Sequence, residues 1–303
     1  MSSVKVAVAG GSGAVGIPVI KELLAAGFLV TVLRRIGSDS SSNLPESSGL
    51  SIREVDYESI ASLTGALQGH TVVVACFGVS APIGSQDVLI DASIAAGVTR
   101  FFPAEFGTDT QNEKCIRLPV FANKIHTLNY LKEKAATNPS FTYTAVCPGF
   151  FIDWGLEGGF LVNPKAHSAT VYDDGERLFS VTTLKTTAKA VVGIINRLEE
   201  TKNRHVYIQD ALVSQIKLIA IAKKLDGRDW DITPIKSSSA EFDAYAELKK
   251  ENPDAQKSLF PLLNLSILGE GYGGDFSAHL DNKLLGIEGF SDNELEHLVR
   301  KYL

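Results

Sequence analysis

Three glycines near the N-terminus have the spacing of a phosphate-binding turn. Gly10, Gly13 and Gly16 follow a short apolar run, residues 4–9, and open a helical pattern. In the order strand, turn and helix, such glycines let the backbone approach a dinucleotide pyrophosphate, and the helix N-terminus offers free N–H groups. The pattern predicts a dinucleotide site, with a purely structural turn as the alternative. The expected contacts here are Gly10, Ser12, Gly13, Ala14, Val15 and Gly16.

Two arginines after the next apolar run indicate which dinucleotide binds. In this kind of site, an acidic residue about 20 positions after the turn binds the ribose 2′-hydroxyl of NAD. No acid occurs between Glu22 and Asp39, whereas Arg34 and Arg35 stand at the expected place. Because guanidinium groups pair well with phosphate, we expect NADPH as the cofactor. An ordinary surface pair of arginines is the alternative.

A tyrosine and a lysine at the spacing Tyr-x-x-x-Lys could serve in proton transfer, with the lysine lowering the pKa of the tyrosine. Tyr130 and Lys134 match this spacing. Lys134, however, lies only seven residues before Phe141, where the next strand is expected. The pair would then lie at the wrong end of its helix, so we expect a solvated helix face.

The elements that must position these residues alternate between strand and helix patterns. Apolar β-branched runs separated by helical crossovers indicate an α/β protein with a doubly wound parallel sheet of the Rossmann type. Helices are predicted over residues 17–26 and 86–96, ending at Gly27 and Gly97. The serine-rich stretch 37–49 is expected to be a solvated loop on the cofactor side. Strands are predicted at residues 5–9, 30–33, 51–55, 71–76, 100–103 and 143–146.

A smaller, C-terminal-rich lobe is expected beyond Phe150, where the alternation fades. Residues 259–276 mix bulky apolar residues with four glycines, which suits a flexible flap over a pocket. We expect residues 1–155 to form the NADP-binding domain, completed by parts of 178–232, and residues 156–303 to form mainly the substrate-binding lobe and flap. Strands are expected near 169–172 and 205–208, and helices at 186–200, 214–225 and 240–252.

The bulk composition argues against several classes of protein. With 303 residues and 45% apolar content the chain can build a proper core. The net charge of −6 comes without a basic block, which gives no electrostatic support for nucleic-acid binding. The first apolar run is too short to span a membrane, and three cysteines without a CxxC pair suggest neither disulfides nor zinc. We expect a cytoplasmic protein with no metal site.

Four segments resemble the NmrA-like and isoflavone-reductase-like branch of the atypical short-chain dehydrogenases. They are AVAGGSGAVG from Ala7, ACFG from Ala75, RFFPAEFGTD from Arg100 and FTYTAVCPGFFIDW from Phe141. The likeness runs over nearly the whole chain and is weakest in the C-terminal portion. The third segment is the most specific and would lie where nicotinamide binds. The resemblance implies further cofactor contacts from Cys76, Phe77, Gly78, Pro103, Ala104, Glu105, Phe106, Lys124, Pro148, Gly149 and Phe150.

The resemblance also implies a catalytic role for Lys124. This residue stands where isoflavone-reductase-like enzymes carry their catalytic lysine, and Val120 replaces the tyrosine of the ordinary pair. Lys124 would contact the nicotinamide ribose and act as general acid or base, directly or through a water. A lysine that only holds the ribose hydroxyls is the alternative. His126 is expected to be structural or exposed.

The expected function is NADPH-dependent hydride transfer to a small aromatic or conjugated substrate of carbonyl, enone or quinone-methide type. Phe106, Phe151 and Trp154 are expected to line the substrate pocket, with core packing as the alternative. A non-catalytic, NADP-binding regulator of the NmrA type is the main competing function. An epimerase or dehydratase would need the missing tyrosine. The expected partner is a small molecule, with neither nucleic acid nor membrane, and the chain could form a homodimer.

Overall fold

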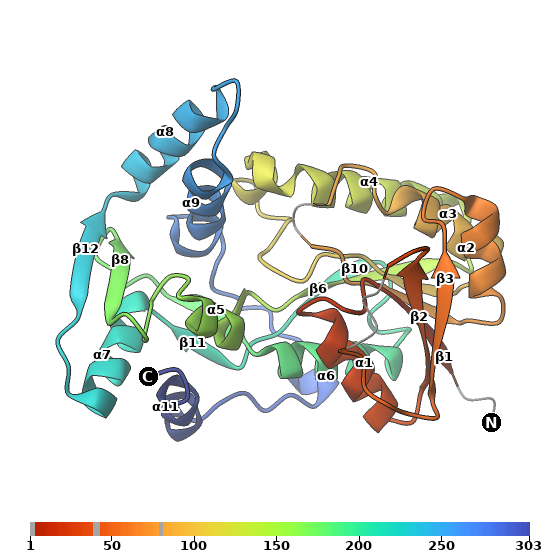
Figure 1. The fold of residues 1–303 in the computed structure, drawn as a ribbon, viewed down its shortest axis with the longest axis horizontal. Coiled ribbons are helices and arrows are strands. Elements are labelled where there is room, and N and C mark those ends of the chain that lie inside the picture. The colour runs from red at the N-terminus through yellow and green to blue at the C-terminus, as the bar shows by residue number, and fades with distance from the viewer. Residues whose placement is uncertain (1–3, 39–42, 79–80) are drawn as a thin grey trace.

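A parallel sheet forms the larger part of the computed structural model, which describes residues 4–38, 43–78 and 81–303. The strand order is β10-β6-β5-β4-β1-β2-β3, and every pairing is parallel (Figure 1). The chain therefore reverses its direction of growth between β1 and β4, which is where this fold class binds its ligands. The strands are β1 (Lys5–Ala9), β2 (Leu29–Arg35), β3 (Leu50–Val55), β4 (Val72–Ala75), β5 (Arg100–Phe102), β6 (Thr142–Cys147) and β10 (Arg204–Tyr207).

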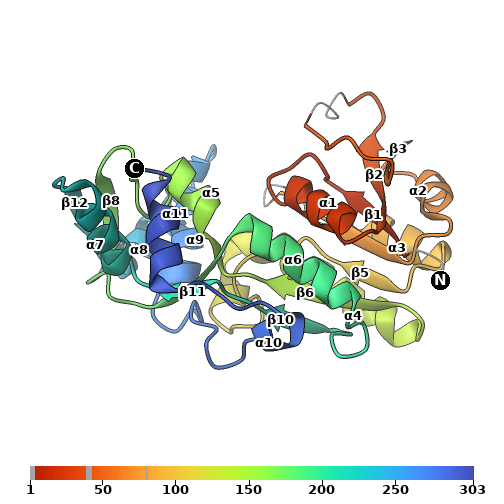
Figure 2. The same ribbon diagram turned by 90° about the horizontal axis from the view of Figure 1, so that it is seen from below.

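Helices cover both faces of this sheet, so its central strands are buried and almost wholly apolar. One face packs against α1 and α6, and the other against α2, α3 and α4 (Figures 1 and 2). The predicted doubly wound fold is confirmed, and the strand expected at 205–208 joins the sheet as β10. The helices are α1 (Gly16–Ala25), α2 (Ile60–Leu67), α3 (Asp87–Ala95), α4 (Ala122–Thr137) and α6 (Leu184–Ile195).

The smaller lobe has its own apolar core and two small sheets (Figure 2). One sheet has the order β11-β9-β7 and the other pairs β12 with β8. Its strands are β7 (Phe150–Phe151), β8 (Ser168–Tyr172), β9 (Phe179–Thr182), β11 (Ala211–Val213) and β12 (Asp231–Ile235). Its helices are α5 (Ile152–Gly158), α7 (Gln215–Asp226), α8 (Ser237–Leu248), α9 (Ala255–Leu268) and α11 (Asp292–Arg300). Three short turns of helix are η1 (Cys115–Arg117), η2 (Pro119–Phe121) and α10 (Asn282–Leu285).

The flexible flap expected over residues 259–276 is wrong for its first part. Residues 255–268 form the packed helix α9, in which Leu262 and Leu265 are fully buried. The helix was not predicted because Pro261 lies inside it and several glycines follow it, and both residue types are unfavourable in a helix. One of those glycines, Gly274, serves close packing, because a Cβ there would lie 2.3 Å from the carbonyl oxygen of Ile267.

Other boundaries differ for local reasons. Helix α6 begins at Leu184, two residues earlier than expected, because the Thr183 side chain caps it by accepting from the amide of Thr186. Of the serine-rich loop expected at 37–49, residues 39–42 lie outside the described residues, and residues 43–49 form neither helix nor strand.

Three negative findings apply to the residues that the structure describes. No helix there combines the length and apolar character needed to cross a membrane. No group of three or more histidines, cysteines and carboxylates in the same part of the chain could hold a metal ion. Cys76, Cys115 and Cys147 are buried free thiols.

Candidate dinucleotide and active site

The three glycines of the phosphate turn meet different surroundings. A Cβ on Gly10, where φ is +74°, would lie 2.6 Å from the Cys76 carbonyl oxygen, and one on Gly16 would lie 2.4 Å from that of Gly10. These two glycines let the protein's own backbone close up. A Cβ placed on Gly13 would have its nearest neighbour, the Gly10 carbonyl oxygen, at 3.4 Å, an ordinary contact distance, so the tip of the turn is open. The neighbours Ser12 and Ala14 are exposed as well.

Helix α1 directs its N-terminus at this open tip. Its N-cap residue, Val15, makes no side-chain cap, so the positive end of the helix dipole faces the turn and favours an anion there. The Ile17 amide already donates to the Gly13 carbonyl at 3.1 Å and Pro18 has no N–H, so within this first turn the Gly16 amide is the one without such a bond. The segment after β4 lies alongside, because the amide of Cys76 donates to the Ala9 carbonyl at 2.8 Å. Phe77 is half-buried and Gly78 exposed. Burial raises the pKa of the Cys76 thiol to about 12, so that side chain stays neutral.

The two arginines at the end of β2 have different partners. Arg34 forms an ion pair of 2.9 Å with Glu54 on the neighbouring strand β3, whereas Arg35 is exposed. Tyr57 follows β3, donates its hydroxyl to the Leu33 carbonyl at 2.9 Å and approaches Phe77 edge-on. Sequence reasoning missed Glu54 and Tyr57. Their signal was their place at the carboxyl end of the third strand, where ligands bind in this fold class.

The loop after β5 holds Lys124, whose helix α4 begins at Ala122. The Lys124 ammonium donates to the carbonyl oxygen of Glu105 and is half-buried. The loop itself is fixed from α3, since the Ala104 amide donates to the Gln86 side chain at 3.0 Å. Lys124 thus lies at the carboxyl edge of the sheet, because β5 runs parallel to β4 and β1 and Glu105 follows β5.

The side chain of Glu105 points into the protein and is only 1% exposed. Its Oε2 accepts from the Thr110 hydroxyl at 2.6 Å, and His205 Nε2 lies 3.3 Å from the same hydroxyl oxygen. Burial raises the pKa of Glu105 and lowers that of His205 to about 4, so His205 is neutral. If Glu105 contacts a cofactor, it does so through its backbone.

Tyr130 and Lys134 lie farther along α4 (Ala122–Thr137), about 9 and about 15 Å along the helix axis from Lys124. Both bind Asp91 on α3: the tyrosine hydroxyl donates to it at 2.8 Å and the lysine forms an ion pair of 2.6 Å. The hydrogen bond to Asp91 raises the pKa of Lys134 above its ordinary value. His126 likewise pairs with Asp87 on α3 at 2.7 Å. These groups join two helices at the surface.

The aromatic residues predicted near nicotinamide are divided between core and surface. Phe106 packs in the core of the sheet, and Phe150 packs in the core of the smaller lobe. Gly149, with φ at +68°, lies against β9, since a Cβ there would be 2.3 Å from the Ser180 carbonyl oxygen. Pro148 is buried, Phe151 is half-buried against the sheet core, and Trp154 is 43% exposed.

Two further aromatic residues, missed from the sequence, extend this group. The Phe160 ring lies 5.7 Å from that of Phe150 and 5.9 Å from that of Trp154, between centroids. Phe260 on α9 lies 5.8 Å from Phe160 and is 39% exposed. Phe160 and Phe260 do not follow a strand of the main sheet. The expectation that ligands bind at the carboxyl ends of its strands could therefore not find them.

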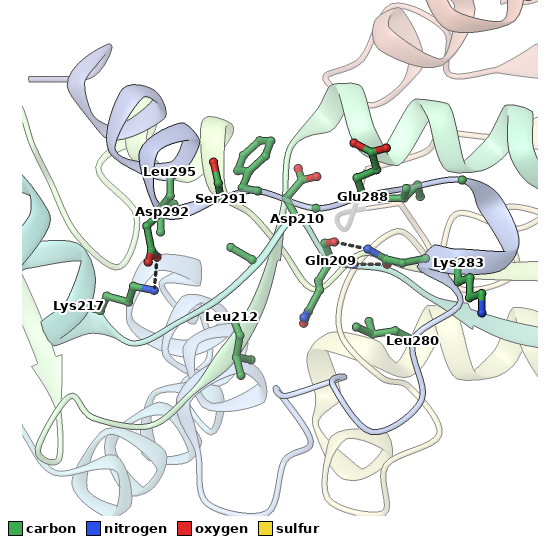
Figure 3. Close-up of a pocket in the computed structure, with 16 residues that line it drawn as sticks. Gln209, Asp210, Leu212, Lys217, Leu280, Lys283, Glu288, Ser291, Asp292 and Leu295 are labelled. Atoms are coloured by element: carbon green, nitrogen blue, oxygen red, sulfur yellow. Dashed lines mark hydrogen bonds and ion pairs between the residues drawn. The ribbon is translucent and has the colours of Figure 1, made fainter.

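A separate open pocket of about 660 Å³ lies between the β10–β11 connection, α10 and the start of α11 (Figure 3). Lys217 and Asp292 form an ion pair of 3.2 Å on its wall, and Asn282 exchanges two hydrogen bonds with the backbone of Gln209. No residue predicted to bind cofactor or substrate lines it. This pocket is therefore separate from the residues predicted to bind cofactor and substrate.

Comparisons with known proteins show the family to which the chain belongs. The NmrA-like family model matches residues 2–239. Oxidoreductase poxI of Penicillium oxalicum is 33% identical over 238 residues, covering 76% of this chain and 71% of the relative. The bifunctional pinoresinol-lariciresinol reductase 2 of Linum usitatissimum is 28% identical over 271 residues, covering 84% and 79%.

Solved structures show the same fold at lower identity. The binary complex of leucoanthocyanidin reductase with NADPH from Vitis vinifera has a TM-score of 0.79 at 18% identity, covering 98% of this chain and 99% of that one. AtPrR2 with NADP+ and (+)pinoresinol has a TM-score of 0.72 at 22% identity, covering all of both chains. From the family match and the relatives' shared class, the chain belongs to the NmrA-like family and is an oxidoreductase.

Proposed function

We propose that this protein binds NADPH along the carboxyl edge of its sheet and reduces a small aromatic or conjugated substrate. The observation that carries the proposal is the position of Lys124, which lies at the same edge of the sheet as the open phosphate turn around Gly13. The leucoanthocyanidin reductase structure contains NADPH, and the AtPrR2 structure contains NADP+ and pinoresinol, which supports the same ligand classes here.

The turn and the arginines would hold the two ends of the adenosine portion. The open backbone at Gly13 and the uncapped start of α1 suit a pyrophosphate. Arg35 is exposed and suits the 2′-phosphate, whereas Arg34 already pairs with Glu54. Ser12 and Ala14 on the tip, with Phe77 and Gly78 after β4, would line the same path.

Bound NADPH would supply the hydride, and Lys124 would donate the proton. Hydride addition to a carbonyl carbon or to the β-carbon of an enone leaves negative charge on the substrate oxygen. An ammonium held at the Glu105 carbonyl could donate a proton to that oxygen, directly or through a water. In the alternative role, Lys124 would hold the ribose hydroxyls and leave proton transfer to solvent.

The aromatic group of the smaller lobe would receive the substrate. Trp154 and Phe260 expose much of their rings and approach each other through Phe160. Such surfaces favour flat, apolar ligands, because ring stacking adds to the burial of apolar area. Phe151, half-buried against the core of the sheet, would face the reacting carbon.

The experiment follows NADPH oxidation with acetophenone, benzylideneacetone and menadione as probes, and measures NADPH affinity separately by fluorescence. Lys124→Ala should lower turnover about 10²–10⁴-fold if the lysine transfers the proton. Lys134→Ala is the matched control on the same helix and should change turnover little. Lost NADPH affinity with full turnover at saturation would reduce Lys124 to a ribose ligand. No turnover by the parent with any probe would contradict the proposed substrate class.

A further inference from the structure

A buried polar cluster lies directly behind the loop that holds Lys124. Glu105, Thr110 and His205 are 1%, 3% and 5% exposed, and they connect this loop to the edge strand β10. The Thr110 hydroxyl donates to Glu105 Oε2 at 2.6 Å, and His205 Nε2 lies 3.3 Å from that hydroxyl oxygen. The cluster is thus a chain of three polar side chains within the protein.

Keeping a carboxyl group at this place is costly. The other carboxyl oxygen of Glu105, Oε1, has no hydrogen-bond partner among the residues that the structure describes. Buried polar groups are normally satisfied, and one that is not costs about 1–3 kcal/mol. Burial also raises the pKa of this carboxyl group. An apolar side chain would fill the same space more cheaply, so stability alone does not explain Glu105.

The backbone of the same residue faces the other way, toward the reaction site. The Glu105 carbonyl accepts from the Lys124 ammonium. Gly107, two residues on, also adjoins this ammonium, since a Cβ there would lie 3.1 Å from Nζ. The Gly107 carbonyl in turn accepts from the Gly149 amide at 3.1 Å. The position of the ammonium therefore depends on how residues 105–107 are held.

We infer that Glu105 is a positioning residue for Lys124. Its side chain, bound to Thr110 and backed by His205, fixes the orientation of the Glu105 peptide, and that peptide aims the ammonium at the substrate. The inference rests on the proposed role of Lys124 in turnover. It assigns Glu105 no contact with cofactor or substrate through its side chain.

The test is a double-mutant cycle between Glu105→Leu and Lys124→Ala, with turnover and NADPH affinity measured on the folded proteins. A misplacement of about 1 Å at a reacting group can cost about 10²-fold in rate, so Glu105→Leu alone should lower kcat by about 10- to 100-fold. NADPH affinity should stay within about threefold. In the absence of Lys124 the loop has nothing to position, so the double variant should match Lys124→Ala within about twofold.

Conservative variants separate positioning from a general loss of structure. Glu105→Gln keeps the shape and the acceptor for Thr110, and should retain kcat within about threefold. Thr110→Val removes the hydroxyl at nearly constant volume and should behave like Glu105→Leu, whereas Thr110→Ser should be close to the parent. If Glu105→Leu does not fold, Thr110→Val takes its place in the cycle.

The outcomes distinguish the inference from the proposed function. Independent effects that multiply in the double variant would overturn the positioning role while leaving the function of Lys124 intact. A Glu105→Gln variant as slow as Glu105→Leu would also overturn it. If Lys124→Ala leaves turnover at saturating NADPH unchanged, Lys124 takes no part in proton transfer and the inference fails, while reduction by the parent protein still stands; no turnover by the parent with any probe would instead make the proposed function fail.

Discussion

At the scale of single residues, the phosphate turn shows how one residue type can have two tasks. Gly10 and Gly16 are required by the fold, because a Cβ on either would collide with backbone. Gly13 has space around it that the fold does not use. A substitution at Gly13 therefore separates ligand binding from stability.

We predict that Gly13→Val abolishes NADPH binding and leaves the melting temperature within a few degrees of the parent. The branched side chain would occupy the space that the pyrophosphate needs. Gly65→Val in α2 is the control, since a Cβ there meets nothing within 4 Å, and it should bind NADPH normally. NADPH titration of both variants is the measurement. Unchanged affinity in a folded Gly13→Val protein would show that the turn is not the pyrophosphate site.

The arginines lead to a second prediction at this scale. Arg35→Ala should weaken NADPH binding by about 1.5–3 kcal/mol, the usual contribution of a hydrogen bond to a charged group, with little change for NADH. Arg34→Ala should have the smaller effect, because Glu54 already occupies its guanidinium. Titrations of both cofactors check this. Equal losses for NADPH and NADH would mean that neither arginine recognises the 2′-phosphate.

Residues that directly follow a strand in the sequence could be predicted as candidate site residues. Residues that reach the site only because two strands pair in a particular register could not. Gly13 and Lys124 could be located from the spacing of the turn and from family resemblance. The partner of Arg34 could not, because Glu54 reaches it only through the pairing of β2 with β3. Tertiary packing also decides that the Glu105 side chain points into the protein. The resemblance that predicted consecutive residues as cofactor contacts could not show which way each side chain points.

At the scale of elements, the buried parallel strands were predicted correctly, whereas the smaller lobe was predicted only in part. Its strand β8 and its helices α7 and α8 lie within four residues of the predicted bounds, but other elements of the lobe were missed. Central strands such as β1 and β4 are continuous apolar runs, because helices cover both of their faces. In the lobe, β7 and β11 are only two and three residues long, too short for a periodic signal. Helix α9 was hidden by its internal proline.

A strap at the C-terminal side gives a prediction for this scale. Asp281, just before α10, accepts two hydrogen bonds from the Arg204 guanidinium, at 2.9 and 2.8 Å, and one from the Tyr207 amide at 3.0 Å. It thereby holds the C-terminal segment against the edge strand β10. Asp281→Ala should lower the free energy of unfolding by about 1.5–3 kcal/mol, as expected for lost charge-assisted bonds.

Urea denaturation measures this effect, and Asp292→Ala is its control. Asp292 pairs with Lys217 at the surface and is 86% exposed, so its loss should cost less than about 1 kcal/mol. Equal effects of the two substitutions would show that Asp281 does not anchor the segment.

At the scale of the whole molecule, the buried cluster of Glu105, Thr110 and His205 links stability to pH. His205 is neutral in the folded protein, because burial lowers its pKa from 6.5 to about 4. The unfolded chain binds a proton at this histidine below its ordinary pKa, whereas the folded protein does not, so stability falls as the pH drops from about 6.5 toward 4. From pH 7 to pH 5 this histidine should account for about 2 kcal/mol of lost stability.

His205→Gln removes this titration and should flatten the pH dependence of the unfolding free energy over the same range. Burial also lowers the pKa of His70, so part of the slope should remain in the variant. The raised pKa of Glu105 acts in the opposite direction, since it removes stability as the pH rises above the ordinary value of 4.5. A variant with the full slope of the parent would show that His205 is not the responsible group.

The most direct test of the central claim is the transfer of deuterium from NADPH labelled at the reacting carbon of nicotinamide. The parent protein is incubated with each of the two stereospecifically labelled cofactors and benzylideneacetone, acetophenone or menadione, and the products are analysed by mass spectrometry and NADP+ formation. The account predicts that at least one carbonyl or enone product carries carbon-bound deuterium from only one of the two cofactors. NADPH that binds tightly and is never oxidised with any of these compounds would contradict it.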